Sequence, residues 1–167
     1  MMYIRTASEG DLEAVRALLV ETWHATYDTI YGRDRVTEIT DDWHATPTLK
    51  GRLKRPESEF ILADDGEEIV GMAFAAAVDG GKTVMLHQLY VKPSHHGRGI
   101  GMMLVDEIEG CFPGASKVRL EVEEANSRAV GFYLRCGFTK IGTTANCGGE
   151  QSGIPAAIFE KPIAWAD

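Results

Sequence analysis

The chain has 167 residues, of which 44% are hydrophobic and 25% charged, a composition typical of one globular domain. Seventeen Lys and Arg residues against twenty-five Asp and Glu residues give a formal charge of −8. This is the wrong sign for a protein that binds duplex nucleic acid through phosphate contacts, and it is better matched to cationic or amine-bearing partners. Composition therefore excludes a disordered chain and a general nucleic-acid binder, and we expect a single domain over residues 1–167.

The cysteines and the amino terminus indicate a reduced, soluble protein. Cys111, Cys136 and Cys147 are odd in number and widely spaced, without a CxxC pair, so the sequence predicts neither a disulfide framework nor a zinc site. The first residues lack the pattern of a signal peptide, and no apolar run has the length of a membrane span. We therefore expect a cytoplasmic protein with no membrane partner.

Helical patterns fill much of the N-terminal third of the chain. Ser8 is placed to cap a helix in which apolar residues from Leu12 to Trp23 recur at helical spacing. A second helical pattern covers residues 33–43, and we expect Pro47 to close it.

Strands dominate the remainder. Two further helices are expected at residues 98–111 and 129–136. The strands are expected at residues 3–6, 59–63, 68–78, 83–91, 117–123, 138–143 and 156–161. Antiparallel strands come first and a β-α-β crossover follows, so we expect an α/β (α+β) fold with a mixed, mostly antiparallel seven-stranded sheet flanked by about four helices.

The segment from Leu89 to Leu104 carries the strongest chemical signal. A strand ends at Pro93, and a loop with glycines at positions 97, 99 and 101 opens directly into a helix. Such glycines let the backbone approach a ligand, and the amides at a helix start attract an anion. A dinucleotide fingerprint would need a glycine where Met102 stands, and a P-loop would need Gly-Lys-Ser/Thr. We interpret the segment as a pyrophosphate cradle; the alternative is a glycine-rich turn without a ligand.

Two motifs carry a family resemblance. His96-Gly97-Arg98-Gly99-Ile100-Gly101 resembles the Gln/Arg-x-x-Gly-x-Gly/Ala motif of the GCN5-related N-acetyltransferases, and a Leu-Tyr-Val-x-Pro strand end precedes it as in that family. Residues 120–138 resemble the family's Leu-x-Val-x-x-x-Asn-x-x-Ala-x-x-Phe-Tyr-x-x-x-Gly-Phe segment. The motif core spans residues 83–140, and the departure is His96, where Gln or Arg is usual.

The resemblance implies the GNAT-type acyl-CoA N-acyltransferase fold, with acetyl-CoA as co-substrate and no metal. It implies that the main chain of residues 89–91 pairs with the pantetheine arm and that the amides of residues 97–102 hold the pyrophosphate. Asn126 resembles the residue that hydrogen-bonds the cofactor, and Tyr133 the residue that faces the thioester sulfur. The expected cofactor-binding set is Leu89, Tyr90, Val91, His96, Gly97, Arg98, Gly99, Ile100, Gly101, Met102, Asn126 and Tyr133.

The resemblance further implies direct attack of a primary amine on the acetyl group. Tyr133 is the expected general acid, because a thiolate leaves poorly without a proton; the alternative is a core aromatic beside Phe132. The amine must be neutral to attack, and Glu121, on the polar side of its strand, is the first candidate base. A solvated carboxylate explains Glu121 equally well. His87 is the alternative base, although a lone strand histidine is more often a core residue.

The acceptor side of the site is less sharply specified. Trp23, Tyr27, Asp28 and Tyr31 are suited to enclose an alkyl-ammonium group, and helix packing explains the aromatics equally well. We expect residues 144–153, which include Cys147 and Glu150, to flex over the acceptor. Cys147 lacks neighbours in sequence that would activate it as an acyl carrier, and the basic run 50–55 is interpreted as a solvated helix end.

The sequence leaves the acceptor open between a small amine or polyamine and a protein amino group. The alternative function is a non-catalytic acyl-CoA-binding regulatory module. A homodimer is a reasonable expectation for an enzyme of this size.

Overall fold

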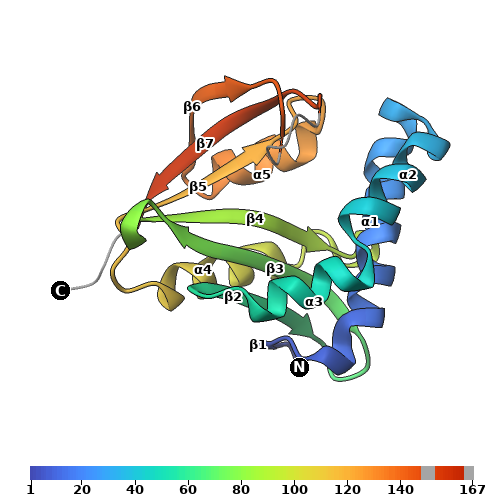
Figure 1. Ribbon diagram of the computed structural model, residues 1–167, viewed down its shortest axis with the longest axis horizontal. Coiled ribbons are helices and arrows are strands. Elements are labelled where there is room, and N and C mark those ends of the chain that lie inside the picture. The colour runs from blue at the N-terminus through green and yellow to red at the C-terminus, as the bar shows by residue number, and fades with distance from the viewer. Residues whose placement is uncertain (148–152, 164–167) are drawn as a thin grey trace. The chain divides into compact units, whose positions relative to one another are not determined.

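A computed structural model describes residues 1–147 and 153–163 and contains a seven-stranded sheet of order β1-β2-β3-β4-β5-β7-β6 (Figure 1). β4 and β5 are parallel, whereas the β1–β2, β5–β7 and β6–β7 pairs are antiparallel. The expected mixed sheet is therefore confirmed. Its strands are β1 (Tyr3–Thr6), β2 (Ser58–Asp64), β3 (Ile69–Val78), β4 (Thr83–Val91), β5 (Lys117–Val122), β6 (Thr139–Thr144) and β7 (Ala156–Pro162).

The described residues contain five α-helices, one more than expected. Our expectation that Pro47 closes the second helix is wrong: Pro47 stands in the first turn of α3, where its missing N–H costs no helical hydrogen bond. The helices are α1 (Leu12–Tyr31), α2 (Arg33–Trp43), α3 (Thr46–Lys54), α4 (Ile100–Cys111) and α5 (Ser127–Arg135), with short 3₁₀ turns η1 (Glu9–Asp11), η2 (Asp79–Gly81) and η3 (Pro93–His95). None of the helices in the described ranges is both long and apolar enough to cross a membrane.

Contacts divide the chain into two compact units. Unit 1 comprises Met1–Ala75 and Gln88–Ile108, and unit 2 comprises Ala76–His87 and Glu109–Asp167. The chain therefore passes from one unit to the other within β3, β4 and α4. That both units belong to one domain stays a prediction.

Helices cover both faces of β2 and β3 in unit 1 (Figure 1). On one face, buried leucines of α1 and α3 pack against Phe60, Leu62, Met72 and Phe74. On the other face, a Cβ atom added at Gly71 would lie 3.2 Å from Leu104 Cδ1 of α4 and 3.2 Å from the Tyr90 carbonyl oxygen. A side chain at position 71 would therefore make its neighbours yield by a few tenths of an ångström, so glycine suits the close packing of α4 on β3.

In unit 2, the alternation along β5 is as expected. Val118, Leu120 and Val122 are buried, whereas Lys117, Arg119 and Glu121 are half-exposed. The C-terminal end of α5 is also as expected, because Gly137 follows the last residues of the helix with a φ of 100°.

The basic run at residues 50–55 is only partly solvated, which corrects our interpretation. Arg52 Nη2 donates to the Trp43 carbonyl at 3.1 Å, and its guanidinium carbon lies 5.9 Å from the centre of the Phe74 ring. Arg52 thereby satisfies a carbonyl at the end of α2 and covers the aromatic core. Lys54 and Arg55 are exposed, as expected for a helix end.

A buried histidine joins α2 to β4 within unit 1. His44 is 0% exposed, and the Gln88 Nε2 amide lies 3.2 Å from His44 Nδ1, which accepts its hydrogen. Burial, followed by the charges of Arg52 and Arg16, lowers the pKa of His44 from 6.5 to about 3. The imidazole is therefore neutral in the folded protein at neutral pH.

This burial predicts a loss of stability in mild acid. Below about pH 6.5, His44 binds a proton in the unfolded chain but stays neutral in the folded chain until about pH 3. Because the unfolded state binds more protons over this range, the free energy of unfolding decreases as pH falls. Between about pH 7.5 and about pH 5, we expect His44→Asn, which keeps an acceptor but does not titrate, to lose about 2 kcal/mol less than the wild type. Urea unfolding across this range measures the difference, and His87→Asn, at an exposed histidine, is the control. Equal losses in wild type and His44→Asn would contradict the prediction.

Candidate functional site

The side chain of Tyr90 anchors the end of β4 to the hydrophobic core. The β4–β5 ladder joins Thr83–Leu86 to Lys117–Leu120, and β4 continues beyond it to Val91. The Trp23 Nε1–H donates to the Tyr90 hydroxyl at 3.0 Å, and Tyr90 packs against the core cluster. Tyr90 is thus anchored in unit 1 by its side chain.

The loop after β4 is fixed at its base. The Lys92 N–H donates to the Val70 carbonyl at 2.7 Å, and the His95 N–H donates to the Lys92 carbonyl at 2.8 Å. His96 Nε2 lies 2.9 Å from the Val91 carbonyl oxygen and must donate, because a carbonyl oxygen only accepts. His96 therefore ties the loop back to the strand end.

Gly97 and Gly99 adopt left-handed backbone conformations, with φ of 78° and 80°. A Cβ atom at either position would meet nothing within 4 Å, so conformation rather than space requires glycine here. Both glycines and Arg98 are exposed, and α4 begins at Ile100 rather than at Arg98.

The start of α4 adds the second part of an anion site. The Met103 N–H donates to the Gly99 carbonyl at 3.1 Å, so the amides of Ile100 and Gly101 precede the first hydrogen bond of the helix. An exposed glycine backbone next to the positive end of a helix fits a pyrophosphate group. A glycine-rich turn without a ligand would have the same conformation and exposure, so the pyrophosphate site stays a prediction.

In unit 2, Asn126 and Tyr133 lie on α5. The Asn126 Oδ1 accepts the Ala129 N–H at 3.2 Å, so Asn126 is the N-cap of this helix. Tyr133 is 8% exposed, and its ring centre lies 5.2 Å from that of Phe132 and 5.5 Å from that of Phe138. Ring packing therefore sets the orientation of the phenol.

Two carboxylates of unit 2 act on the thiol of Cys147. Glu121 is half-exposed opposite Ile158 of β7, whereas Glu123 is 4% exposed. Burial, followed by the negative charges of Glu121 and Glu123, raises the pKa of Cys147 to about 12. The Cys147 thiol is thus protonated at neutral pH, which disfavours it as an acyl carrier.

Glu123 is a residue that sequence reasoning missed. Alternation placed it with Arg119 and Glu121 on the polar side, but β5 ends at Val122 and the pattern ends with it. The side chain of His87 on β4 is exposed, although a lone histidine on a strand is more often buried in the core.

The aromatic run of α1 divides into buried and half-exposed parts. Trp23 and Tyr27 are 3% and 6% exposed, and their ring centres lie 4.6 Å apart. Tyr31 stacks on Tyr27 at 5.8 Å and is half-exposed, as is Asp28, whose Oδ1 lies 2.6 Å from His24 Nδ1. Packing therefore accounts for Trp23 and Tyr27, and Asp28 and Tyr31 are the residues accessible to an acceptor.

The loop expected to flex over the acceptor lies partly outside the described residues, which omit 148–152 and therefore Glu150. Its described ends are joined: the Cys147 N–H donates to the Ile154 carbonyl at 2.6 Å, and the Gly153 N–H donates to the Asn146 Oδ1 at 2.9 Å.

Comparison with known proteins identifies the family. The Acetyltransferase (GNAT) family model matches residues 12–138. Thialysine N-epsilon-acetyltransferase of Bos taurus is 28% identical over 146 residues, which are 80% of this chain and 82% of that protein. Spermidine N(1)-acetyltransferase of Thermoplasma acidophilum is 28% identical over 141 residues, which are 81% and 86%.

Solved structures share the fold. The PaiA N-acetyltransferase of Thermoplasma acidophilum in complex with coenzyme A has a TM-score of 0.85 at 24% identity, covering 97% of this chain and 99% of that one. Because the family model spans most of the chain, the protein belongs to the GNAT family and is an N-acetyltransferase with acetyl-CoA as its co-substrate.

Proposed function

We propose that the protein acetylates a small aliphatic amine, with a peptide amino group as the competing acceptor. The observation that carries the proposal is the half-exposed pair Asp28 and Tyr31 on α1, three residues apart and therefore neighbours on the helix surface. A carboxylate beside an aromatic face attracts an alkyl-ammonium group. The formal charge of −8 acts in the same direction, and the relatives that act on thialysine and spermidine match over most of this chain.

We propose that the cofactor residues are those of the sequence motifs. The exposed glycine loop and the start of α4 support pyrophosphate binding by residues 97–102, and the strand end supports pairing of residues 89–91 with the pantetheine arm. The thioester supplies the activated acetyl group. Asn126 and Tyr133 complete the proposed set from α5.

Tyr133 and Glu121 are the proposed proton carriers. The Tyr133 hydroxyl donates a proton to the departing thiolate sulfur, and the Glu121 carboxylate accepts the proton of the attacking amine, directly or through a water molecule. Half-exposure of Glu121 on β5 supports this role, because a base must reach solvent to pass its proton on. His87 is the competing base.

The acceptor class is tested by release of free CoA from acetyl-CoA with panels of polyamines, aminoglycosides, amino acids and short peptides. We expect kcat/KM on an aliphatic diamine or polyamine to exceed that on peptides by at least about tenfold, which corresponds to about 1.4 kcal/mol of transition-state binding.

Asp28→Asn should raise KM for the amine, whereas Asp42→Asn, at an exposed position of α2, should not. Preference for peptides would replace the proposed acceptor, and acetyl-CoA binding without turnover on any amine would favour the regulatory module.

The acid role predicts a selective loss in Tyr133→Phe. Phe keeps the ring packing with Phe132 and Phe138 but has no proton to give, so kcat should fall by about 100-fold while the Kd for acetyl-CoA stays within about twofold. In the same assay, Glu121→Gln should lower kcat, and His87→Gln should leave kcat unchanged. An unchanged kcat in Tyr133→Phe would remove Tyr133 from the acid role, and the reverse result at Glu121 and His87 would assign the base to His87.

The left-handed loop predicts a specific sensitivity to alanine. Alanine at φ 80° costs about 1–2 kcal/mol, so Gly99→Ala should shift the loop and weaken acetyl-CoA binding by at least about tenfold in calorimetry. Gly110→Ala is the matched control, because Gly110 lies within α4 with nothing within 4 Å of an added Cβ. Equal affinities in the two variants would remove this loop from the proposed cofactor site.

A further inference from the structure

Two loops of unit 1 bring three metal-ligating side chains together. Asp65 and Glu68 belong to the turn between β2 and β3, and His95 is the last residue of η3. One ligand atom from each lies within 4.8 Å of the others. We propose that Asp65, Glu68 and His95 bind a divalent transition-metal ion of the Zn²⁺ class, at a site that takes no part in acetyl transfer and does not rest on the proposed acceptor.

Asp65 is held as a ready ligand. Its Oδ1 accepts the N–H groups of Glu67 at 2.9 Å and Glu68 at 2.8 Å, which fixes the carboxylate and leaves Oδ2 directed at His95. A carboxylate oriented in this way is preorganised as a metal ligand.

His95 faces Asp65 at a distance suited to a shared ion. Its Nε2 lies 3.7 Å from Asp65 Oδ2, which is too long for a hydrogen bond. Two ligand atoms that are each about 2.0–2.2 Å from one ion lie roughly 3–4 Å apart. The two side chains are 15% and 26% exposed, so an ion between them would be partly shielded from water.

Ser94 supplies the outer partner of the imidazole. Its Oγ lies 2.9 Å from His95 Nδ1. When Nδ1–H donates to Ser94, the Nε2 lone pair points at Asp65, and a metal-bound histidine normally has such a partner on its other nitrogen. In that tautomer and without a cation, the Nε2 lone pair of His95 would face the Asp65 carboxylate, and both groups are acceptors.

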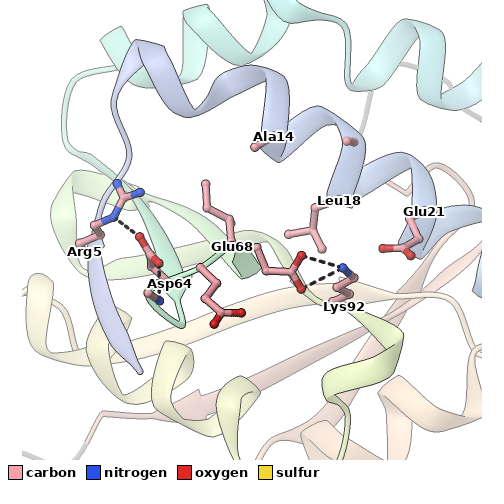
Figure 2. Close-up of a pocket in the computed structure, with 11 residues that line it drawn as sticks. Arg5, Ala14, Leu18, Glu21, Asp64, Glu68 and Lys92 are labelled. Atoms are coloured by element: carbon pink, nitrogen blue, oxygen red, sulfur yellow. Dashed lines mark hydrogen bonds and ion pairs between the residues drawn. The ribbon is translucent and has the colours of Figure 1, made fainter. Parts of the chain in front are cut away.

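Glu68 is the third ligand and is currently shared with a lysine. Lys92 Nζ lies 3.0 and 3.1 Å from the two Glu68 oxygens, as Figure 2 shows. The charge of Glu21 also acts on Lys92, so the ammonium has another carboxylate nearby when a metal takes Glu68. Glu68 is exposed, so an ion can reach its carboxylate from solvent.

The donor set selects the ion. One imidazole and two carboxylates favour Zn²⁺ and similar first-row ions, whereas Mg²⁺ and Ca²⁺ prefer oxygen ligands alone. Three protein ligands leave a coordination position for water. The other charges around the cluster are Lys92, the amino terminus, and Asp64, which is paired with Arg5.

Calorimetric titration of the chelator-treated full chain with ZnCl₂ tests the site. We expect one Zn²⁺ ion per chain, and at least about tenfold weaker binding in both His95→Ala and Asp65→Asn. Lys92→Met should tighten binding, because it removes the cation that competes for Glu68. MgCl₂ should give no comparable heat.

The matched control is His24→Ala. His24 also faces an aspartate, but in direct contact with Asp28 at 2.6 Å, so its loss should leave Zn²⁺ binding unchanged. Circular dichroism without metal shows that each variant is folded. Unchanged Zn²⁺ affinity in folded His95→Ala would overturn the proposal, and so would thiolate charge-transfer absorption of a Co²⁺-loaded protein, which would assign the ion to cysteine.

Discussion

The left-handed backbone at Gly97 and Gly99 is the constraint around which the rest of unit 1 is arranged. Glycine adopts this conformation without strain, and the position of the loop is set by the anchoring of its two ends. The strand end is fixed by the hydrogen bonds from Lys92 to Val70 and from His96 to Val91, and the helix end by the burial of Ile100. With its ends anchored, the loop keeps Gly97, Arg98 and Gly99 exposed, as an anion site requires.

Close packing of α4 extends this constraint into the sheet. Leu104 lies against Gly71, where an added Cβ atom would be in tight contact, at 3.2 Å, with Leu104 and with the Tyr90 carbonyl. Tyr90 is in turn held by Trp23 of α1. α1 and β3 thus both contact the strand end that precedes the glycine loop, although neither element contributes a residue to that loop.

Local motifs predicted much of this arrangement, and non-local contacts account for what they missed. The β4–loop–α4 segment was predictable because its glycines, strand end and helix start are consecutive in sequence. Pro47 was misinterpreted because proline both ends helices and begins them, and only the packing of Leu49 in the core decides between the two. The burial of Glu123 could not be predicted from strand alternation. Glu123 follows Val122, the last residue of β5, so the alternation of buried and exposed side chains no longer applies to it.

The candidate site shows the same limit. Spacing along α1 grouped Trp23, Tyr27, Asp28 and Tyr31 correctly on one helix, but only tertiary packing separates the two buried rings from the two accessible side chains. The cluster of Asp65, Glu68 and His95 has no sequence motif, because its ligands come from two loops about thirty residues apart, beyond the short ligand spacings that sequence motifs encode.

The two consecutive histidines of the loop illustrate how a short 3₁₀ turn separates functions. His95 ends η3 and directs Nε2 at Asp65, whereas His96 follows the turn and donates from Nε2 to the Val91 carbonyl. A hydrogen bond to a carbonyl requires His96 to keep its Nε2 proton, while a ligand role requires His95 to give up the same proton. The two adjacent histidines thus need opposite tautomers. Substitution of His95 would affect the proposed metal site, whereas substitution of His96 would remove the hydrogen bond to the Val91 carbonyl.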